Sequence, residues 1–135
     1  MIRKLLLSLV MLIGAVVGYG MYRDAAMPQR ILQKSGIQFS EKPKLISRVV
    51  RNSGPFGSDQ LEMAEFQLGG ADVEAMRECN IPGFKKGSPD SPEFLGSLSK
   101  APANMNTVCW KLISGKEEFL FVLFDDVIAY RLIIM

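Results

Sequence analysis

Residues 107–135 read TVCWKLISGKEEFLFVLFDDVIAYRLIIM, and this stretch decides the fold. It contains three apolar runs, 107–113, 119–124 and 127–135, separated by the turn sequences SGKE and DD. Runs rich in β-branched and aromatic residues that are joined by short turns are typical of an antiparallel meander. The middle run, FLFVLF, is apolar at every position and predicts a central strand covered on both faces. The chain is therefore expected to end inside its own sheet.

Two earlier runs extend the predicted sheet. Residues 44–51 (KLISRVVR) mix β-branched side chains with charges, which indicates a strand with one solvated side. Residues 61–68 (LEMAEFQL) contain good helix formers, and Asp59 with Glu62 resembles a helix capping box. The run is short, however, and stands between a glycine-rich loop and a Gly-Gly pair, so we predict a strand that forms a hairpin with 44–51. A helix is the alternative for 61–68.

The clearest helix of the C-terminal part covers residues 71–79. Acidic residues lie in its first turn, where the helix dipole favours them, and Val73, Met76 and Cys79 recur at a spacing of three. We therefore expect residues 44–135 to form one α+β domain, in which this helix packs on a small antiparallel sheet of about five strands.

A long loop over residues 81–106 interrupts this pattern. It contains four prolines and three glycines and shows no sustained periodicity. Loops of this length in compact domains are usually functional or flexible. This loop is either a surface insertion that packs loosely on the domain or a functional loop that contacts a protein partner or the membrane. Phe56, in the glycine-rich loop 52–59, either contacts a partner or folds back onto the core. The predicted partner-binding residues are Phe56, Phe84, Lys85, Lys86, Phe94 and Leu95.

An uncharged N-terminal run, residues 5–22 (LLLSLVMLIGAVVGYGMY), follows Arg3 and Lys4. As a helix it would be roughly 27 Å long, close to the hydrocarbon thickness of a bilayer, so residues 1–23 are predicted to be a membrane anchor or uncleaved signal segment. The basic pair favours a single-pass protein of the inner (cytoplasmic) membrane, with its C-terminal domain in the periplasm or outside the cell. Cleavage after the small residues Gly18 and Gly20 is the alternative.

Two further features accompany this segment. Gly14 and Gly18 match the G-x-x-x-G spacing that lets two membrane helices approach closely, although an incidental glycine pair has the same spacing. Residues 24–43 are expected to form a juxtamembrane helix and linker. Pro28 suits a first helical turn and Gly36 the position just beyond a last turn, which predicts a short helix over 28–35.

The chain contains two cysteines, Cys79 and Cys109, and both follow the apolar segment. An even number on the exported side of a membrane favours a disulfide. It would close a loop of about 30 residues, worth roughly 3 to 4 kcal/mol in the chain-entropy account. Two separate buried thiols are the alternative.

Composition argues against several functions. Outside residues 1–23 the chain has 13 basic and 14 acidic residues, so no excess of positive charge attracts nucleic acid. Histidine is absent, which removes the commonest general base and metal ligand, and no zinc spacing, phosphate loop or dinucleotide fingerprint occurs. The adjacent acids at 117–118 and 125–126 lie where turns are predicted, and solvated neighbours have similar pKa values. We therefore expect no cofactor, no metal and no enzymatic activity.

These observations together predict a non-catalytic, membrane-anchored exported domain that binds or scaffolds a protein partner at the outer face of the membrane. The alternative is a secreted or periplasmic inhibitor or immunity-type protein released by signal cleavage. A small hydrolase that uses only carboxylates is a third hypothesis, and it requires a deep cleft that raises a carboxyl pKa.

Overall fold

The computed structural model describes residues 1–53, 59–89, 93–99, 102 and 104–134, and within them all side chains except those of 20–25, 53 and 105. Contacts divide the chain into two compact units, Met1–Leu32 and Gln33–Met135, and each is described by itself.

The first unit belongs to one helix, α1 (Ile2–Gln33), of 32 residues. Its segment Ile2–Tyr19 has a mean hydropathy of 1.8, and none of it is buried within the protein. The predicted N-terminal apolar helix is therefore confirmed. By length and composition it can cross a membrane, and a signal sequence near an N-terminus has the same properties.

The prediction of a separate short helix starting at Pro28 is wrong, because α1 continues through that residue. A proline inside a helix removes one backbone hydrogen bond and normally kinks or ends the helix. Residues 21–27, however, contain neither glycine nor proline, so nothing interrupts the helix before Pro28. Gly36 follows the helix with a φ of 81°, a left-handed conformation that glycine adopts without strain, as expected for the position beyond a helix end.

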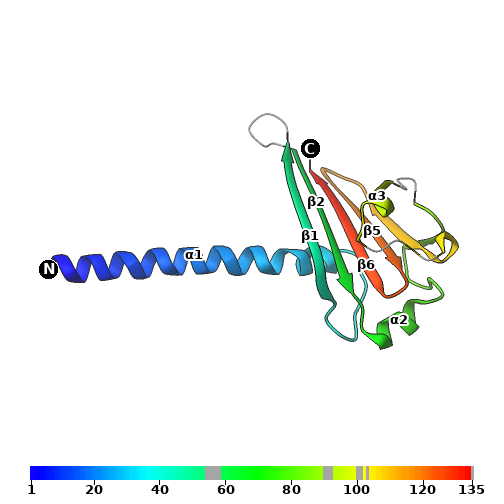
Figure 1. Ribbon diagram of the computed structural model, residues 1–135, viewed down its shortest axis with the longest axis horizontal. Coiled ribbons are helices and arrows are strands. Elements are labelled where there is room, and N and C mark those ends of the chain that lie inside the picture. The colour runs from blue at the N-terminus through cyan, green and yellow to red at the C-terminus, as the bar shows by residue number, and fades with distance from the viewer. Residues whose placement is uncertain (54–58, 90–92, 100–101, 103, 135) are drawn as a thin grey trace. The chain divides into compact units, whose positions relative to one another are not determined.

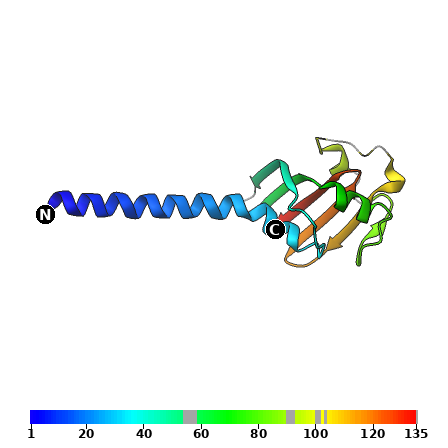
Figure 2. The same cartoon turned by 90° about the horizontal axis from the view of Figure 1, so that it is seen from below.

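The second unit is built on one antiparallel sheet with the strand order β1-β2-β6-β5-β4-β3 (Figures 1 and 2). The predicted α+β fold is confirmed. The prediction of a strand, and not a helix, at residues 61–68 is also confirmed. Six strands replace the expected five, because the loop at 81–106 contributes a two-residue strand that no periodicity announces. The strands are β1 (Lys44–Ser53), β2 (Asp59–Gln67), β3 (Lys85–Lys86), β4 (Cys109–Ile113), β5 (Glu117–Phe124) and β6 (Val127–Ile134).

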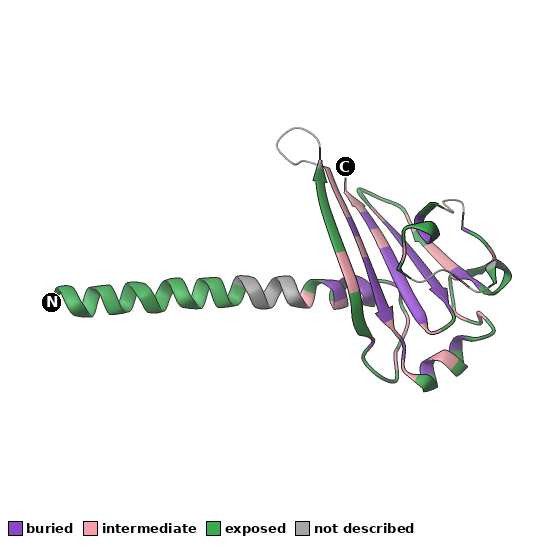
Figure 3. Cartoon of the chain, in the orientation of Figure 1, coloured by how far each residue is buried: buried purple, intermediate pink, exposed green. Residues whose placement is uncertain are grey.

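The C-terminal strand β6 lies in the middle of the sheet and joins the β1–β2 hairpin to the β4–β5 hairpin. Ala129, for example, pairs with Glu65 on one side and with Val122 on the other. All of the run FLFVLF is buried, which confirms that β5 is covered on both faces. Figure 3 shows this burial concentrated in β2, β6 and β5, while β1 is mostly exposed.

Helix α2 (Gly70–Met76) begins one residue before the predicted range and ends three residues before its end. Of the predicted apolar stripe, Met76 is buried and Val73 is half-buried. Asp72 and Met76, four residues apart, are its buried side chains, while Cys79 lies beyond the helix with a φ of 57°. The Asp72 carboxylate accepts hydrogen bonds from the backbone N–H groups of Ser40 (2.8 Å) and Glu41 (3.2 Å). The buried Asp72 side chain thus anchors the linker that precedes β1.

The described part of the segment 81–106 contains more secondary structure than expected. Besides β3 it contains α3 (Glu93–Gly96) and a 3₁₀ turn, η2 (Met105–Thr107). Phe94 and Leu95 of α3 belong to an apolar cluster whose other buried members are Val108, Leu120, Val122, Phe124, Val127 and Ala129. The α3 turn therefore packs on one face of the sheet.

Candidate interaction surface

The structure describes five of the six predicted partner-binding residues, and these five fall into three groups. Phe94 and Leu95 are each only 3% exposed, so the expectation that they face a partner is wrong: the α3 turn directs both into the core. Phe84 is half-buried, with the Lys111 Nζ 5.9 Å from its ring centre. Phe56 lies outside the described residues.

Lys85 and Lys86, the third group, are exposed on the edge strand β3. The Lys85 Nζ lies 5.2 Å from the ring centre of Trp110 on β4, a cation–π distance. These two lysines are therefore accessible, on an edge that is only two residues long.

The predicted disulfide is present between Cys79 and Cys109, with Cα atoms 5.8 Å apart. It connects the end of the α2 segment to the first residue of β4 and closes the part of the chain that contains β3, α3 and η2. A disulfide is typical of an oxidising compartment.

Four of the five exposed large apolar side chains in the described part of the second unit lie on the opposite edge strand, β1. Its four exposed aliphatic residues, hereafter the β1 surface, are 41 to 47% exposed: Leu45, Ile46, Val49 and Val50. Within the described sheet, β1 has a neighbouring strand on one side only, and edge strands present unpaired backbone N–H and C=O groups. A register shift between Leu45 and Ser47 marks a bulge at Ile46, and regular pairing continues from Ser47 to Ser53.

A buried polar cluster holds β1 in position. The carboxylate of Glu62 on β2 is 1% exposed and accepts hydrogen bonds from the Arg48 Nε (3.2 Å) and Nη2 (2.7 Å). The Tyr130 hydroxyl of β6 donates to the second Glu62 oxygen. Burial, together with this hydrogen bond to the carboxylate, raises the pKa of Tyr130 far above its usual value, so the hydroxyl remains a donor at neutral pH.

The Glu62 carboxylate identifies one face of the sheet, and the side chains of β1 can be assigned relative to it. Arg48 and Val50 lie on the Glu62 face of the sheet, and Ser47, Val49 and Arg51 lie on the other, because side chains alternate along a strand. Sequence reasoning missed Glu62, since one glutamate in an amphipathic run has the same pattern whether it is solvated or paired in the interior.

A second buried carboxylate, Glu65, is 4% exposed and accepts hydrogen bonds from the backbone N–H (2.7 Å) and hydroxyl of Ser99. Glu62 and Glu65 are three residues apart on one strand, so they point to opposite faces of the sheet. They cannot act together on one substrate bond. Each carboxylate instead connects β2 to another part of the domain.

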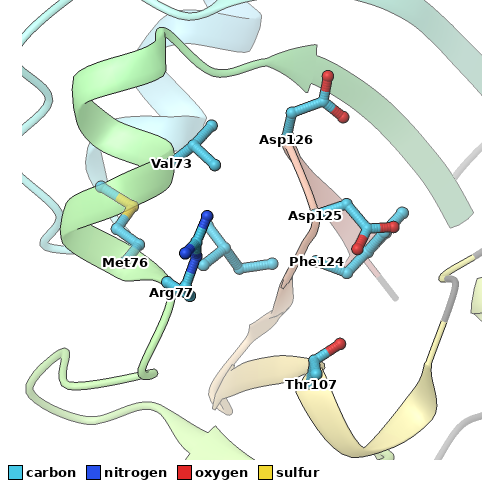
Figure 4. Close-up of a pocket in the computed structure, with 8 residues that line it drawn as sticks. Val73, Met76, Arg77, Thr107, Phe124, Asp125 and Asp126 are labelled. Atoms are coloured by element: carbon cyan, nitrogen blue, oxygen red, sulfur yellow. The ribbon is translucent and has the colours of Figure 1, made fainter.

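A pocket of about 490 Å³ lies between α2 and the β5–β6 turn. Figure 4 shows Val73, Met76 and Arg77 on one side of it and Phe124, Asp125 and Asp126 on the other. The Arg77 Nη2 pairs with Glu74 at 2.9 Å, and Asp126 accepts a hydrogen bond from the Gln67 side chain at 2.6 Å. Both polar groups thus have partners within the domain.

A smaller hollow of about 370 Å³ lies at the start of β1, where Lys42, Lys44 and Ile46 contribute to its lining. It extends the β1 surface at its N-terminal end. Among the described residues, no group of three His, Cys, Asp or Glu side chains converges as metal ligands do.

The glycines predicted to pair two helices, Gly14 and Gly18, lie one turn apart on α1, and no other part of the described protein lies within 4 Å of a Cβ built on either. Pairing through them stays a prediction. Comparison of the chain with known protein families, curated proteins and solved structures finds no match.

Proposed function

We propose that this protein is a non-catalytic, membrane-anchored domain that binds a protein partner at the outer face of the membrane through β1. The observation that carries the proposal is the cluster of exposed aliphatic side chains on an edge strand. Exposed apolar residues beside unpaired backbone groups are the features that peptide-binding sheet edges use.

The apolar helix Ile2–Tyr19 and the disulfide support the anchored, exported location. Arg3 and Lys4 precede the helix and favour an N-terminus on the cytoplasmic side of the inner membrane, which delivers the domain to the periplasm or the cell exterior. The intact mass of the natively expressed chain, extracted from membranes and alkylated with and without reduction, tests this location. A mass that begins at Met1 with two protected cysteines is expected.

A mass that begins near Met21 would instead support the alternative function, a soluble inhibitor or immunity-type protein released by signal cleavage. The same helix supports this alternative, because a signal sequence has its position and composition. Free, alkylated cysteines would contradict export to an oxidising compartment.

Partner binding is tested by site-specific photo-crosslinking of the full chain in its native membrane. A photoreactive residue replaces Val49 on β1 or, as the matched control, Leu112 on β4, which is exposed to a similar extent (42 and 43%) but lies four strands away. We expect one defined protein adduct at Val49 and none at Leu112. No adduct at Val49, or the same adducts at both positions, would refute the proposal.

A further inference from the structure

The partner chemistry can be inferred from the charges and backbone of β1, and this inference rests on the function proposed above. After the bulge at Ile46, the seven residues from Ser47 to Ser53 pair regularly with β2 and provide a regular edge of about 23 Å. An edge of this length accommodates a complete added strand, since most strands have five or six residues.

The side chains on this edge favour an apolar strand. Val49 and Val50 are each 42% exposed and lie on opposite faces of the sheet. A strand added to β1 would therefore meet a valine on each face, and β-branched side chains at its centre would pack against both.

The charges around the edge favour an acidic partner. Lys42, Lys44 and Arg51 form no ion pair within the described part of the chain, and no acidic residue occurs in β1. Lys42 and Lys44 line the hollow at one end of the strand, and Glu41 is the one carboxylate there. Arg51 lies near the other end, so acidic residues of a partner strand would find a cation at each end.

The same charges disfavour a second copy of this chain. If two β1 strands paired antiparallel with residues 44–51 fully overlapped, Lys44 of each copy would lie opposite Arg51 of the other. Like charges directly opposite each other destabilise a strand pair, and edge charges and bulges commonly prevent such self-association. An oppositely charged strand meets no such barrier.

We infer that β1 binds an extended, acidic segment of a partner protein as a seventh strand of the sheet. Backbone hydrogen bonds along residues 47–53 supply the pairing, and Val49 and Val50 contact its centre. Arg51 selects a carboxylate near one end of the added strand, and Lys44, on the far side of the bulge, selects one just beyond the other end.

The probe is a synthetic nine-residue peptide that alternates valine and threonine and carries an aspartate near each end. Its binding to the full chain in nanodiscs of uncharged lipid is measured by fluorescence anisotropy. The comparison peptide has lysines in place of the aspartates. We expect the acidic peptide to bind about tenfold more tightly, with the preference weakening as salt is added.

Two matched variants locate the effect. Arg51→Glu should weaken binding of the acidic peptide about fivefold and improve binding of the lysine peptide, whereas Lys116→Glu, a charge reversal in the exposed turn between β4 and β5, should alter either by less than about twofold. Methylation of alternate backbone nitrogens should abolish binding for one set of positions and spare it for the other, because alternate N–H groups of a strand face opposite sides.

Equal effects of Arg51→Glu and Lys116→Glu, or indifference to backbone methylation, would overturn the inference. If photo-crosslinking at Val49 still gives a defined adduct, the proposed function stands and only the acidic-strand chemistry fails. If that adduct is also missing, both fail.

Discussion

Replacing Arg48 by methionine removes the cation from a carboxylate that is almost completely buried. Glu62 is 1% exposed, and in the described structure the Tyr130 hydroxyl would be its one remaining side-chain donor. Breaking a buried ion pair by removing one partner typically costs about 3–5 kcal/mol. Because the Arg48 side chain is itself 20% exposed, we expect the lower end of that range.

A loss of about 3 kcal/mol corresponds to a fall of about 15 °C in the melting temperature of a domain of this size. Thermal unfolding followed by circular dichroism measures it on the full chain in detergent. Arg51→Met is the matched control, because Arg51 lies on the same strand and is exposed without an ion pair among the described residues. Its effect should stay within about 0.5 kcal/mol.

The compensating variant tests the cause. Adding Glu62→Leu and Tyr130→Phe to Arg48→Met removes the whole polar cluster, and apolar replacement of a complete buried pair is often neutral or stabilising. The triple variant should therefore be more stable than Arg48→Met alone. An Arg48→Met variant as stable as Arg51→Met, or a triple variant less stable than Arg48→Met, would refute the conclusion that Arg48 stabilises the buried Glu62 carboxylate.

Three further outcomes are expected. Burial alone would raise the pKa of Asp72, but the hydrogen bonds from Ser40 and Glu41 outweigh it and hold that pKa below its usual value. Asp72 therefore stabilises the fold above the unfolded-state pKa, about 4, and loses this contribution as the pH falls through the folded-state pKa. Urea unfolding between pH 6 and 2 should show a smaller acid-induced loss in Asp72→Asn than in the parent; equal losses would contradict the assignment. Replacing both Cys79 and Cys109 by alanine opens a loop with a sequence separation of 30 and should cost about 3.6 kcal/mol in urea unfolding, and an unchanged midpoint would count against the pairing. Phe94→Ala should cost about 3–5 kcal/mol, as for a core aromatic, whereas a surface residue would give a value near zero in the same assay.

The elements that sequence reasoning predicted correctly have strong local signals. FLFVLF is apolar at every position and is bounded by turn sequences, so its central place followed from composition. For residues 61–68, the glycines on either side indicated a strand despite the helix propensity of the residues themselves. The length and lack of charge of residues 5–22 indicated the N-terminal helix. In each case neighbouring residues along the chain carry the information.

Other features depend on residues that are distant in sequence. Phe94 and Leu95 stand in a segment rich in proline and glycine, and only the sheet beneath them makes that short helical turn a part of the core. Lys85 and Lys86 form the strand β3 because their backbone pairs with the edge of β4, and no local sequence pattern indicates this pairing. The helix through Pro28 has a local cause instead, because residues 21–27 contain no glycine or proline that would end it.

The sequence by itself determined the apolar N-terminal helix, the α+β class, the two hairpins and the cysteine pair, because hydrophobic period, turn residues and cysteine count act locally. Only the tertiary structure decided which polar groups are buried. Glu62 finds Arg48 and Tyr130 across three strands, at sequence separations of 14 and 68. Which edge strand keeps its aliphatic side chains exposed was also decided there, because exposure depends on the strand order of the complete sheet.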